Sequence, residues 1–199
     1  MAISLQTERL LLRAWRDEDL EPFTALNCDP QVMRYFPRLL DRAATAKVVK
    51  KMQAHHETYS FGYWPIEVPG VAPFIGIVGL MITPFRAHFT PCIEVAWRLA
   101  RPYWGQGYAT EGARASLTFA FKYLPVLEEV VAFAVPDNQR SLGVMERLGM
   151  VRRQEDDFDH PALADGHPLR RHCLYRMSRE RWASVSADDD EAAVKVRLS

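Results

Sequence analysis

The chain has 199 residues, and its 25 lysines and arginines are balanced by 25 aspartates and glutamates, so the formal net charge at neutral pH is zero. This length suits one domain with its own core, and the neutral charge argues against nucleic acid or an anionic membrane as a general partner. Three widely spaced cysteines, and the lack of an apolar run of the roughly 18 residues that a membrane span needs, lead us to expect a soluble, cytoplasmic protein with reduced thiols.

The first half of the chain shows both helix and strand patterns. Asp17, Glu18 and Asp19 are residue types that cap a helix and fill its first turn. Pro69 and Gly70 separate two runs rich in β-branched and aromatic residues, which indicates a hairpin or meander. In chain order we predict a strand at 10–13, a helix from 17 to about 27, a helix from 41 to about 57, and strands at 61–68 and 74–82.

The second half contains a strand-helix-strand unit. From Ile93 to Leu99 the core-type side chains alternate with others, so one face of this strand lies in the core and Glu94 points away from that face. The run 130–135 is continuously apolar, which favours a strand buried on both faces and paired in parallel near the centre of the sheet. The further predicted elements are a helix at 106–123, a helix that starts at Asp137 or Asn138 and is closed by Gly149, and strands at 151–157 and 170–177.

The C-terminal residues differ in composition from the rest of the chain. After Trp182 come several serines and the acidic run 188–191, which is typical of a solvated tail. We therefore predict one domain at 1–182 and a polar, acidic tail at 183–199.

Two glycines, Gly105 and Gly107, lie between the strand at 93–99 and the helix at 106–123. Glycines at the start of a helix let successive backbone N–H groups point outward, where the helix dipole favours an anion such as a diphosphate. The turn is not a Walker loop, because no Gly-Lys-Ser/Thr follows, and Thr110 replaces the third glycine of a dinucleotide-binding motif. A simple connection between strand and helix is the alternative interpretation.

Four features in the correct order resemble the GNAT superfamily of acetyl-CoA-dependent N-acetyltransferases, over about residues 7–182. Residues 104–109, Trp-Gly-Gln-Gly-Tyr-Ala, fall on the family's loop pattern R/Q-x-x-G-x-G/A, although Trp104 departs from its first position. The run 103–111 instead resembles the branch of ribosomal-protein N-terminal acetyltransferases, the RimJ/RimL type. The other features that resemble this branch are Thr-Glu-Arg-Leu-Leu-Leu-Arg at 7–13, Asn138-x-x-Ser141 with Leu148-Gly149-Met150, and Leu174-Tyr175 before Trp182.

The resemblance implies a mixed α/β fold with a central, largely antiparallel sheet of six to seven strands, a splayed parallel pair and about four flanking helices. It also implies acetyl-CoA as the cosubstrate. In the family, loop amides bind the pyrophosphate and the preceding strand pairs with the pantetheine arm, as an added strand would. The cofactor-binding residues implied here are Val95, Ala96, Trp97, Leu99, Gly105, Gln106, Gly107, Tyr108, Ala109 and Thr110, with Asn138 for the pantetheine and Arg140 for the nucleotide phosphates.

Transfer of an acetyl group to an amine needs a base that takes the ammonium proton and a hydrogen-bond donor to the oxyanion. The leaving CoA thiolate must also be protonated or released as it is, and no protein nucleophile is required. The backbone near Val95 to Trp97 is the candidate oxyanion donor. Glu94 is the candidate general base, with a surface or substrate-orienting carboxylate as the alternative. Met145 replaces the tyrosine that many family members use as thiolate acid, so Ser141 becomes the candidate donor to the sulfur, unless its hydroxyl only bonds backbone in the first helical turn.

The acceptor implied by the resemblance is a primary amine, and a protein N-terminal α-amine is one candidate. The alternatives are a small-molecule amine, such as an antibiotic or a metabolite, and a non-catalytic sensor that binds acyl-CoA. Two groups bear on the acceptor: carboxylates for an acidic cleft (Glu94, Asp156, Asp157, Asp159) and aromatic residues for a pocket or for core packing (Trp64, Phe85, Phe89). We expect a monomer or homodimer, no nucleic-acid or membrane partner, and no metal at the loop-like set of His160, Asp165, His167 and His172.

Overall fold

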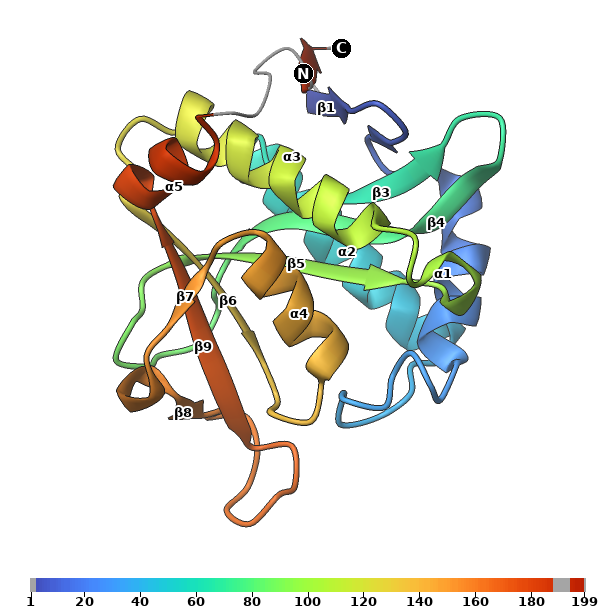
Figure 1. Cartoon of the computed structure of the whole chain (residues 1–199). Coiled ribbons are helices and arrows are strands. Elements are labelled where there is room, and N and C mark those ends of the chain that lie inside the picture. The colour runs from blue at the N-terminus through green and yellow to red at the C-terminus, as the bar shows by residue number, and fades with distance from the viewer. Residues whose placement is uncertain (1–2, 188–193, 199) are drawn as a thin grey trace.

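The computed structural model describes residues 3–187 and 194–198, which form one mixed sheet with helices on both of its faces (Figure 1). Neighbouring strands follow the order β10-β1-β2-β3-β4-β5-β6-β9-β7, and β8 pairs with β9 beside this path. The strands are β1 (Ile3–Gln6), β2 (Leu11–Leu12), β3 (Tyr63–Val68), β4 (Ala72–Ile82), β5 (Ile93–Leu99), β6 (Glu129–Ala134), β7 (Val151–Arg152), β8 (Phe158–Asp159), β9 (Arg171–Ser178) and β10 (Lys195–Leu198). The helices are α1 (Leu20–Cys28), α2 (Arg42–Tyr59), α3 (Tyr108–Tyr123), α4 (Gln139–Arg147) and α5 (Arg179–Val185).

Strands β5 and β6 run in parallel, whereas every other strand pair in the described part of the chain is antiparallel. They pair at only two positions, where Ile93 faces Val130 and Glu94 faces Val131. Beyond these positions the strands diverge, β5 staying paired with β4 and β6 with β9 (Figure 1). The sheet therefore contains a V-shaped opening between two of its central strands, with Glu94 at the apex.

The two faces of the sheet bury different cores. The larger core lies under α3 and α4 and contains Val95 and Leu99 of β5, because alternate residues of a strand share a face. The smaller core lies under α1 and α2, which Figure 1 shows on the far side of the sheet, and it includes Phe23 and Met52. Glu94 projects from β5 on the face of α1 and α2, as the alternation in the sequence predicts.

Capping side chains and glycines set the limits of the helices near the opening. The Asp41 carboxylate accepts a hydrogen bond from the Ala44 amide at 2.7 Å and begins α2. Asn138 caps α4 in the same way, and Gly149 follows this helix with a φ of 80°, a left-handed conformation that ends it. Both limits of α4 agree with the sequence prediction.

The predicted fold class is confirmed, with differences at the sheet edges. β1, β8 and β10 are short strands that the sequence analysis did not predict, and the strand predicted at 151–157 shrinks to β7. These strands have two to four residues each, which is too short for a period-2 pattern to be recognised in a sequence. The described residues also form a fifth helix, α5, where about four were predicted.

The described residues of the C-terminal segment, 183–187 and 194–198, are more structured than a solvated tail. The predicted boundary at residue 182 falls inside α5, whose Trp182 is buried in the larger core. β10 pairs with β1 from Ile3 with Leu198 to Gln6 with Lys195, and so covers the edge of the sheet. The acidic run 188–191 lies outside the described residues. Within the described segments, no helix is both long and apolar enough to cross a membrane.

Candidate functional site

The glycine turn at the wide end of the opening presents backbone donors. Gly105 and Gly107 have φ angles of 74° and 83°, which side-chain-bearing residues rarely adopt, so the turn requires glycine at both positions. In the described structure the amides of Gly107, Tyr108 and Ala109 have no protein acceptor, because they are the first amides of α3. Three amides at the positive end of a 16-residue helix make a site that fits a diphosphate.

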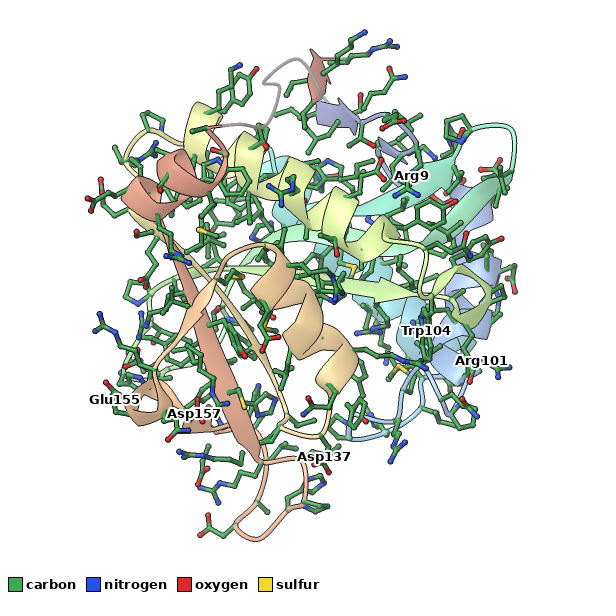
Figure 2. The ribbon with its side chains drawn as sticks, in the orientation of Figure 1. Arg9, Arg101, Trp104, Asp137, Glu155 and Asp157 are labelled. Atoms are coloured by element: carbon green, nitrogen blue, oxygen red, sulfur yellow. The ribbon has the colours of Figure 1, made fainter. Side chains whose placement is uncertain are left out.

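The N-terminal hairpin braces this turn through Arg9. The guanidinium donates hydrogen bonds to the Gln106 carbonyl at 3.0 Å and to the Glu111 carboxylate at 2.7 Å, and it lies 4.8 Å from the centre of the Tyr108 ring. Thr7 donates to the same carboxylate at 2.6 Å. Figure 2 shows Arg9 beside the loop that leads into α3. The sequence analysis used Thr7 and Arg9 only as part of a resemblance and missed this contact, which joins segments about 100 positions apart.

Trp104 and Arg140 connect the glycine turn to α4 across the opening. The Trp104 indole N–H donates to the Leu99 carbonyl at 2.8 Å, which holds the ring at the end of β5. The Arg140 guanidinium lies 4.5 Å from the centre of this ring, a cation–π contact. Arg140 is therefore in contact with the residue before the turn, and its side chain is exposed at the same mouth as the amides.

One edge of β5 faces the opening without a strand partner. From Val95 to Leu99 the strand bonds β4 on one side, whereas its pairing with β6 ends at Glu94. Val95 and Leu99 anchor this segment in the larger core, at 1% and 6% exposure. A fixed strand with an unpaired edge can bind an extended chain by backbone hydrogen bonds, which suits the predicted contacts of Val95, Ala96, Trp97 and Leu99 with a pantetheine arm.

Glu94, at the apex, has the electrostatics of a general base. Its carboxylate is withdrawn from water among the residues of the smaller core, and this desolvation raises its pKa from the usual 4.5 to about 8. The Tyr63 hydroxyl donates a hydrogen bond to it and acts in the opposite direction. A carboxylate whose pKa lies near neutral pH can take a proton from an amine and still be regenerated.

Arg98 completes a polar group on the same face of the sheet. Its guanidinium donates to the Asn27 side chain at 2.6 Å and lies 4.0 Å from the centre of the Phe36 ring, and burial lowers its pKa to about 10. The Tyr63 hydroxyl interacts electrostatically with both the Glu94 carboxylate and the Arg98 guanidinium. The sequence analysis missed Tyr63 and Arg98. The alternation of β5 already placed Arg98 on the face of Glu94. Nothing in the sequence indicates that the side chain of Tyr63, on β3, reaches Glu94 on β5 across the strand between them.

Asn138, predicted to contact the pantetheine, and Ser141, the candidate donor to the sulfur, lie at the start of α4. The Asn138 side-chain oxygen accepts from the Ser141 amide at 3.3 Å, so this oxygen acts as the helix cap. The Ser141 hydroxyl has no hydrogen-bond partner among residues 3–187 and 194–198 and is half-buried. Met145 is 2% exposed in the larger core. The Ser141 hydroxyl is thus available to a ligand, while Met145 is a packing residue.

A segment between α1 and α2 crosses to the start of α4. The Tyr35 hydroxyl donates to the Asp137 carbonyl at 2.9 Å, and Figure 2 places Asp137 at the turn between β6 and α4. Phe36 of the same segment is partly exposed and stacks on Arg98. This segment therefore borders the opening on the face of Glu94, opposite to the face of the glycine turn and α4.

The predicted acidic cleft is wrong for three of its four carboxylates. Each of the three aspartates pairs with an arginine: Asp156 with Arg176 at 2.8 Å, Asp157 with Arg152 at 2.5 Å, and Asp159 with Arg171 at 3.3 Å. Asp156 and Asp157 are also largely screened from water by their surroundings. Of these four carboxylates, Glu94 is the one without an arginine partner in the described structure. A substrate with several positive charges therefore finds little uncompensated negative charge.

The aromatic candidates separate into core and site residues. Trp64 is completely buried in the larger core, so it packs rather than lines a pocket. Phe85 and Phe89 are half-buried and belong to a cluster of rings with His160 and His172. In the part of the chain that the structure describes, no group of three or more histidine, cysteine, aspartate or glutamate side chains is arranged to hold a metal ion.

Comparison with known proteins shows the family of the chain. A family model described as "Acetyltransferase (GNAT) domain" matches residues 9–151. The chain is 33% identical over 147 residues to the uncharacterized protein YkkB of Bacillus subtilis (strain 168), a match that covers 73% of this chain and 84% of that protein. It is 29% identical over 190 residues to the FsC-acetyl coenzyme A-N(2)-transacetylase of Aspergillus fumigatus, covering 90% of this chain and 77% of that protein.

Solved structures agree with the sequence matches. An acetyltransferase (GNAT family) from Bacillus anthracis superposes with a TM-score of 0.72 at 26% identity, over 89% of this chain and 99% of that one. Two structures from Vibrio cholerae share the fold alone. One is a spermidine N-acetyltransferase in complex with CoA and spermine, with a TM-score of 0.67 at 18% identity over 87% of this chain and 98% of that one. The other is a proposed ribosomal-protein-serine acetyltransferase, with a TM-score of 0.68 at 17% identity over 88% and 97%.

The family model spans well over half of the chain. Members of the family use acetyl-CoA as the acetyl donor. The chain belongs to the GNAT family of acetyltransferases and is an N-acetyltransferase.

Proposed function

We propose that the protein transfers the acetyl group of acetyl-CoA directly to a primary amine in the opening between β5 and β6. The observation that carries this proposal is the placement of Glu94 at the apex of the opening, where the unpaired edge of β5 begins. A carboxylate with a raised pKa at this point is suited to act on an amine that approaches the thioester. The amide turn at the wide end is suited to hold the diphosphate of the same donor molecule.

The proposed cofactor site follows from the two sides of the opening. The amides of the turn from Gly105 to Thr110 face the pyrophosphate, and the edge of β5 from Val95 to Leu99 pairs with the pantetheine. Asn138 and Arg140 contact the cofactor from α4. Support comes from the lack of protein acceptors for the first amides of α3 and from the position of Arg140 beside Trp104.

The proposed chemistry is a direct substitution at the thioester. Glu94 accepts a proton from the substrate ammonium, the neutral nitrogen attacks the carbonyl carbon, and a C–N bond forms. A backbone N–H of β5 near Val95 to Trp97 donates to the oxyanion. The C–S bond then breaks and its electron pair leaves with the sulfur, while the Ser141 hydroxyl donates a hydrogen bond to the developing thiolate. The nitrogen loses its remaining extra proton as the amide forms, and this proton neutralises the thiolate. The products are an amide and coenzyme A, and no covalent enzyme intermediate is formed.

For the acceptor we propose a primary amine of one of two classes. A protein N-terminal α-amine is supported by the resemblance of residues 7–13 and 103–111 to the RimJ/RimL branch, and a small amine is supported by the ring cluster near Glu94. We also propose a cytoplasmic location, in keeping with three cysteines that form no disulfide in the described structure.

Release of coenzyme A in the presence of amines tests the proposed function. The protein is incubated with acetyl-CoA and a panel of primary amines, free thiol is followed with a thiol reagent, and products are identified by mass spectrometry. We expect thiol release that depends on the amine and matches the amount of acetylated product. Tight binding of CoA without release for any amine would instead support a non-catalytic acyl-CoA sensor.

A further inference from the structure

A half-exposed wall of rings extends from the apex of the opening on the face of Glu94. The Phe85 ring lies 4.5 Å from His160 and 5.9 Å from Phe133, measured between ring centres. Phe133 in turn lies 5.8 Å from His172. We call this set the aromatic wall, and its members are Phe85, Phe89, Phe133, Phe158, His160 and His172.

The strand register places the wall next to the reacting atoms. Val131 of β6 pairs with Glu94 of β5, so their side chains share one face of the sheet. Phe133 lies two residues further along β6 and therefore on that same face, at the level of Ala96 across the opening. Val131 itself is buried in the apolar cluster under the wall. An amine at Glu94 would consequently have ring surface beside the carbon skeleton that it carries.

The wall has a buried base and an accessible surface. Phe158 is 6% exposed and forms the base, whereas the other five members are only half-buried. An open surface hollow of about 410 Å³ lies against Phe85 and is also lined by Thr83 and Thr90. This volume is within the range of sites that hold small organic ligands. The wall is thus able to contact a ligand and is not only part of the core.

The charges around the wall disfavour a polycation. Each of Asp156, Asp157 and Asp159 is compensated by an arginine, as described above. Burial also lowers the pKa values of His160 and His172, so both imidazoles are neutral at neutral pH. A polyamine or a basic peptide would therefore meet Glu94 and one partly compensated pair, Asp156 and Glu129, which share Arg176. A ring or another bulky apolar group would replace water on aromatic surfaces.

We propose that the acceptor is a monoamine whose skeleton carries an aromatic or similarly bulky apolar group close to the amino group. This inference rests on the proposed function and names the substrate class of the same site. The ring of the acceptor contacts Phe85 and Phe133 while its amine reaches Glu94. The aromatic wall then determines specificity through KM and kcat/KM for the amine, and it has no part in binding acetyl-CoA.

A comparison of four amines with the wild-type protein is the first test. 2-Phenylethylamine, ethylamine, spermidine and a lysine-rich peptide with a free N-terminus are compared by kcat/KM for thiol release. We expect 2-phenylethylamine to exceed the other three by at least about tenfold, because burial of a ring contributes more than that factor. A preference for spermidine or for the peptide would overturn the inference while leaving the acetyltransferase activity in place. Absence of release with every amine would overturn the proposed function as well.

A pair of variants provides the second test. Phe85→Ala removes one ring of the wall from an irregular segment between β4 and β5, so we expect KM for 2-phenylethylamine to rise about tenfold with KM for acetyl-CoA unchanged. The control is Tyr123→Ala, which removes a 47% exposed ring at the end of α3. An unchanged ratio of kcat/KM between 2-phenylethylamine and ethylamine in folded Phe85→Ala would contradict the inference.

Discussion

The two sides of the opening are built by different means and, in the proposed site, would recognise their ligands differently. On the side of α3 and α4, the site is built mainly from backbone: the amides of the glycine turn and the free edge of β5. On the side of α1 and α2, it is built from side chains, with Glu94, Tyr63 and Arg98 next to the aromatic wall. Backbone recognition suits a donor common to a whole family, whereas side-chain recognition can differ from one member to the next.

This difference separates the expected effects of substitutions. A change on the acceptor side should alter turnover or the preference for amines and leave CoA affinity as it is. A change at the glycine turn or its brace should alter CoA affinity first. Variants that affect both properties equally would show that the two sides are not independent.

The largest effect is expected for Glu94→Gln. The amide has nearly the same size but cannot accept the proton, so kcat should fall by about 10²- to 10⁴-fold. CoA affinity, measured by calorimetry, should be unchanged because the carboxylate lies at the apex and not at the amide turn. A variant that retains more than about a tenth of wild-type kcat would remove Glu94 from its role as general base.

Arg9→Ala is expected to weaken CoA binding by roughly tenfold, because the turn loses a charge-assisted brace to the Gln106 carbonyl and to Glu111. The matched control is Arg42→Ala, which breaks an exposed ion pair with Glu21 far from the turn. Calorimetric titration of both variants with CoA checks the prediction. Equal CoA affinities for the two variants would show that the brace does not position the turn.

The pH dependence of the wild-type protein should reflect the raised pKa of Glu94. The base is active when ionised, so kcat should increase with pH and level off above about 8. Tyr63→Phe removes a hydrogen bond that lowers this pKa, so the midpoint of the profile should move to higher pH and activity at neutral pH should fall. A midpoint that moves to lower pH, or does not move, would contradict this coupling.

The same pKa predicts that the stability of the fold depends on pH. Because the folded-state pKa of Glu94 lies above its ordinary value of 4.5, the folded state holds the proton more tightly than the unfolded state. The carboxyl therefore destabilises the fold progressively as pH rises from about 4.5 to about 8. Thermal unfolding of wild type and Glu94→Gln over this range should show a difference that grows in favour of the variant.

Arg140→Ala should have the smallest effect. The exposed cation–π contact with Trp104 is worth about 0.5–1 kcal/mol, so CoA affinity should fall by roughly two- to fivefold. Arg153→Ala, which removes an exposed arginine directly after β7, is the control and should leave CoA binding unchanged. An unchanged CoA affinity in Arg140→Ala would remove Arg140 from the proposed cofactor site.

The sequence predicted the backbone side of the site far better than the side-chain side. The glycine turn, the cap at Asn138 and the alternating strand β5 depend on neighbours in the chain, so their signals are local and readable. Glu94 was also placed on the correct face, because strand alternation decides it. What the alternation could not reveal is that this face is covered by α1 and α2, which raises the pKa of the carboxylate.

The remaining features arise from contacts between distant segments. Arg9 meets Glu111 and Gln106 only because β1 and β2 bring the N-terminal hairpin beside α3. The arginine partners of Asp156 and Asp159 come from β9, so the acidic cluster of the sequence carries little net charge in the fold. Short strands such as β10 depend on an available edge rather than on a pattern of their own. Such features follow from the tertiary structure and have no signature in a single sequence.

Binding of CoA to a matched pair of glycine variants tests the central claim that backbone amides of the turn hold the diphosphate. Gly105 and Gly70 have φ angles of 74° and 76°, and a Cβ atom would meet nothing within 4 Å at either position, so an aspartate costs the fold about the same at both. By calorimetry, Gly105→Asp should weaken CoA binding by at least about tenfold through repulsion of the diphosphate, and Gly70→Asp should bind as the wild type does. Equal affinities for the two variants would contradict the claim.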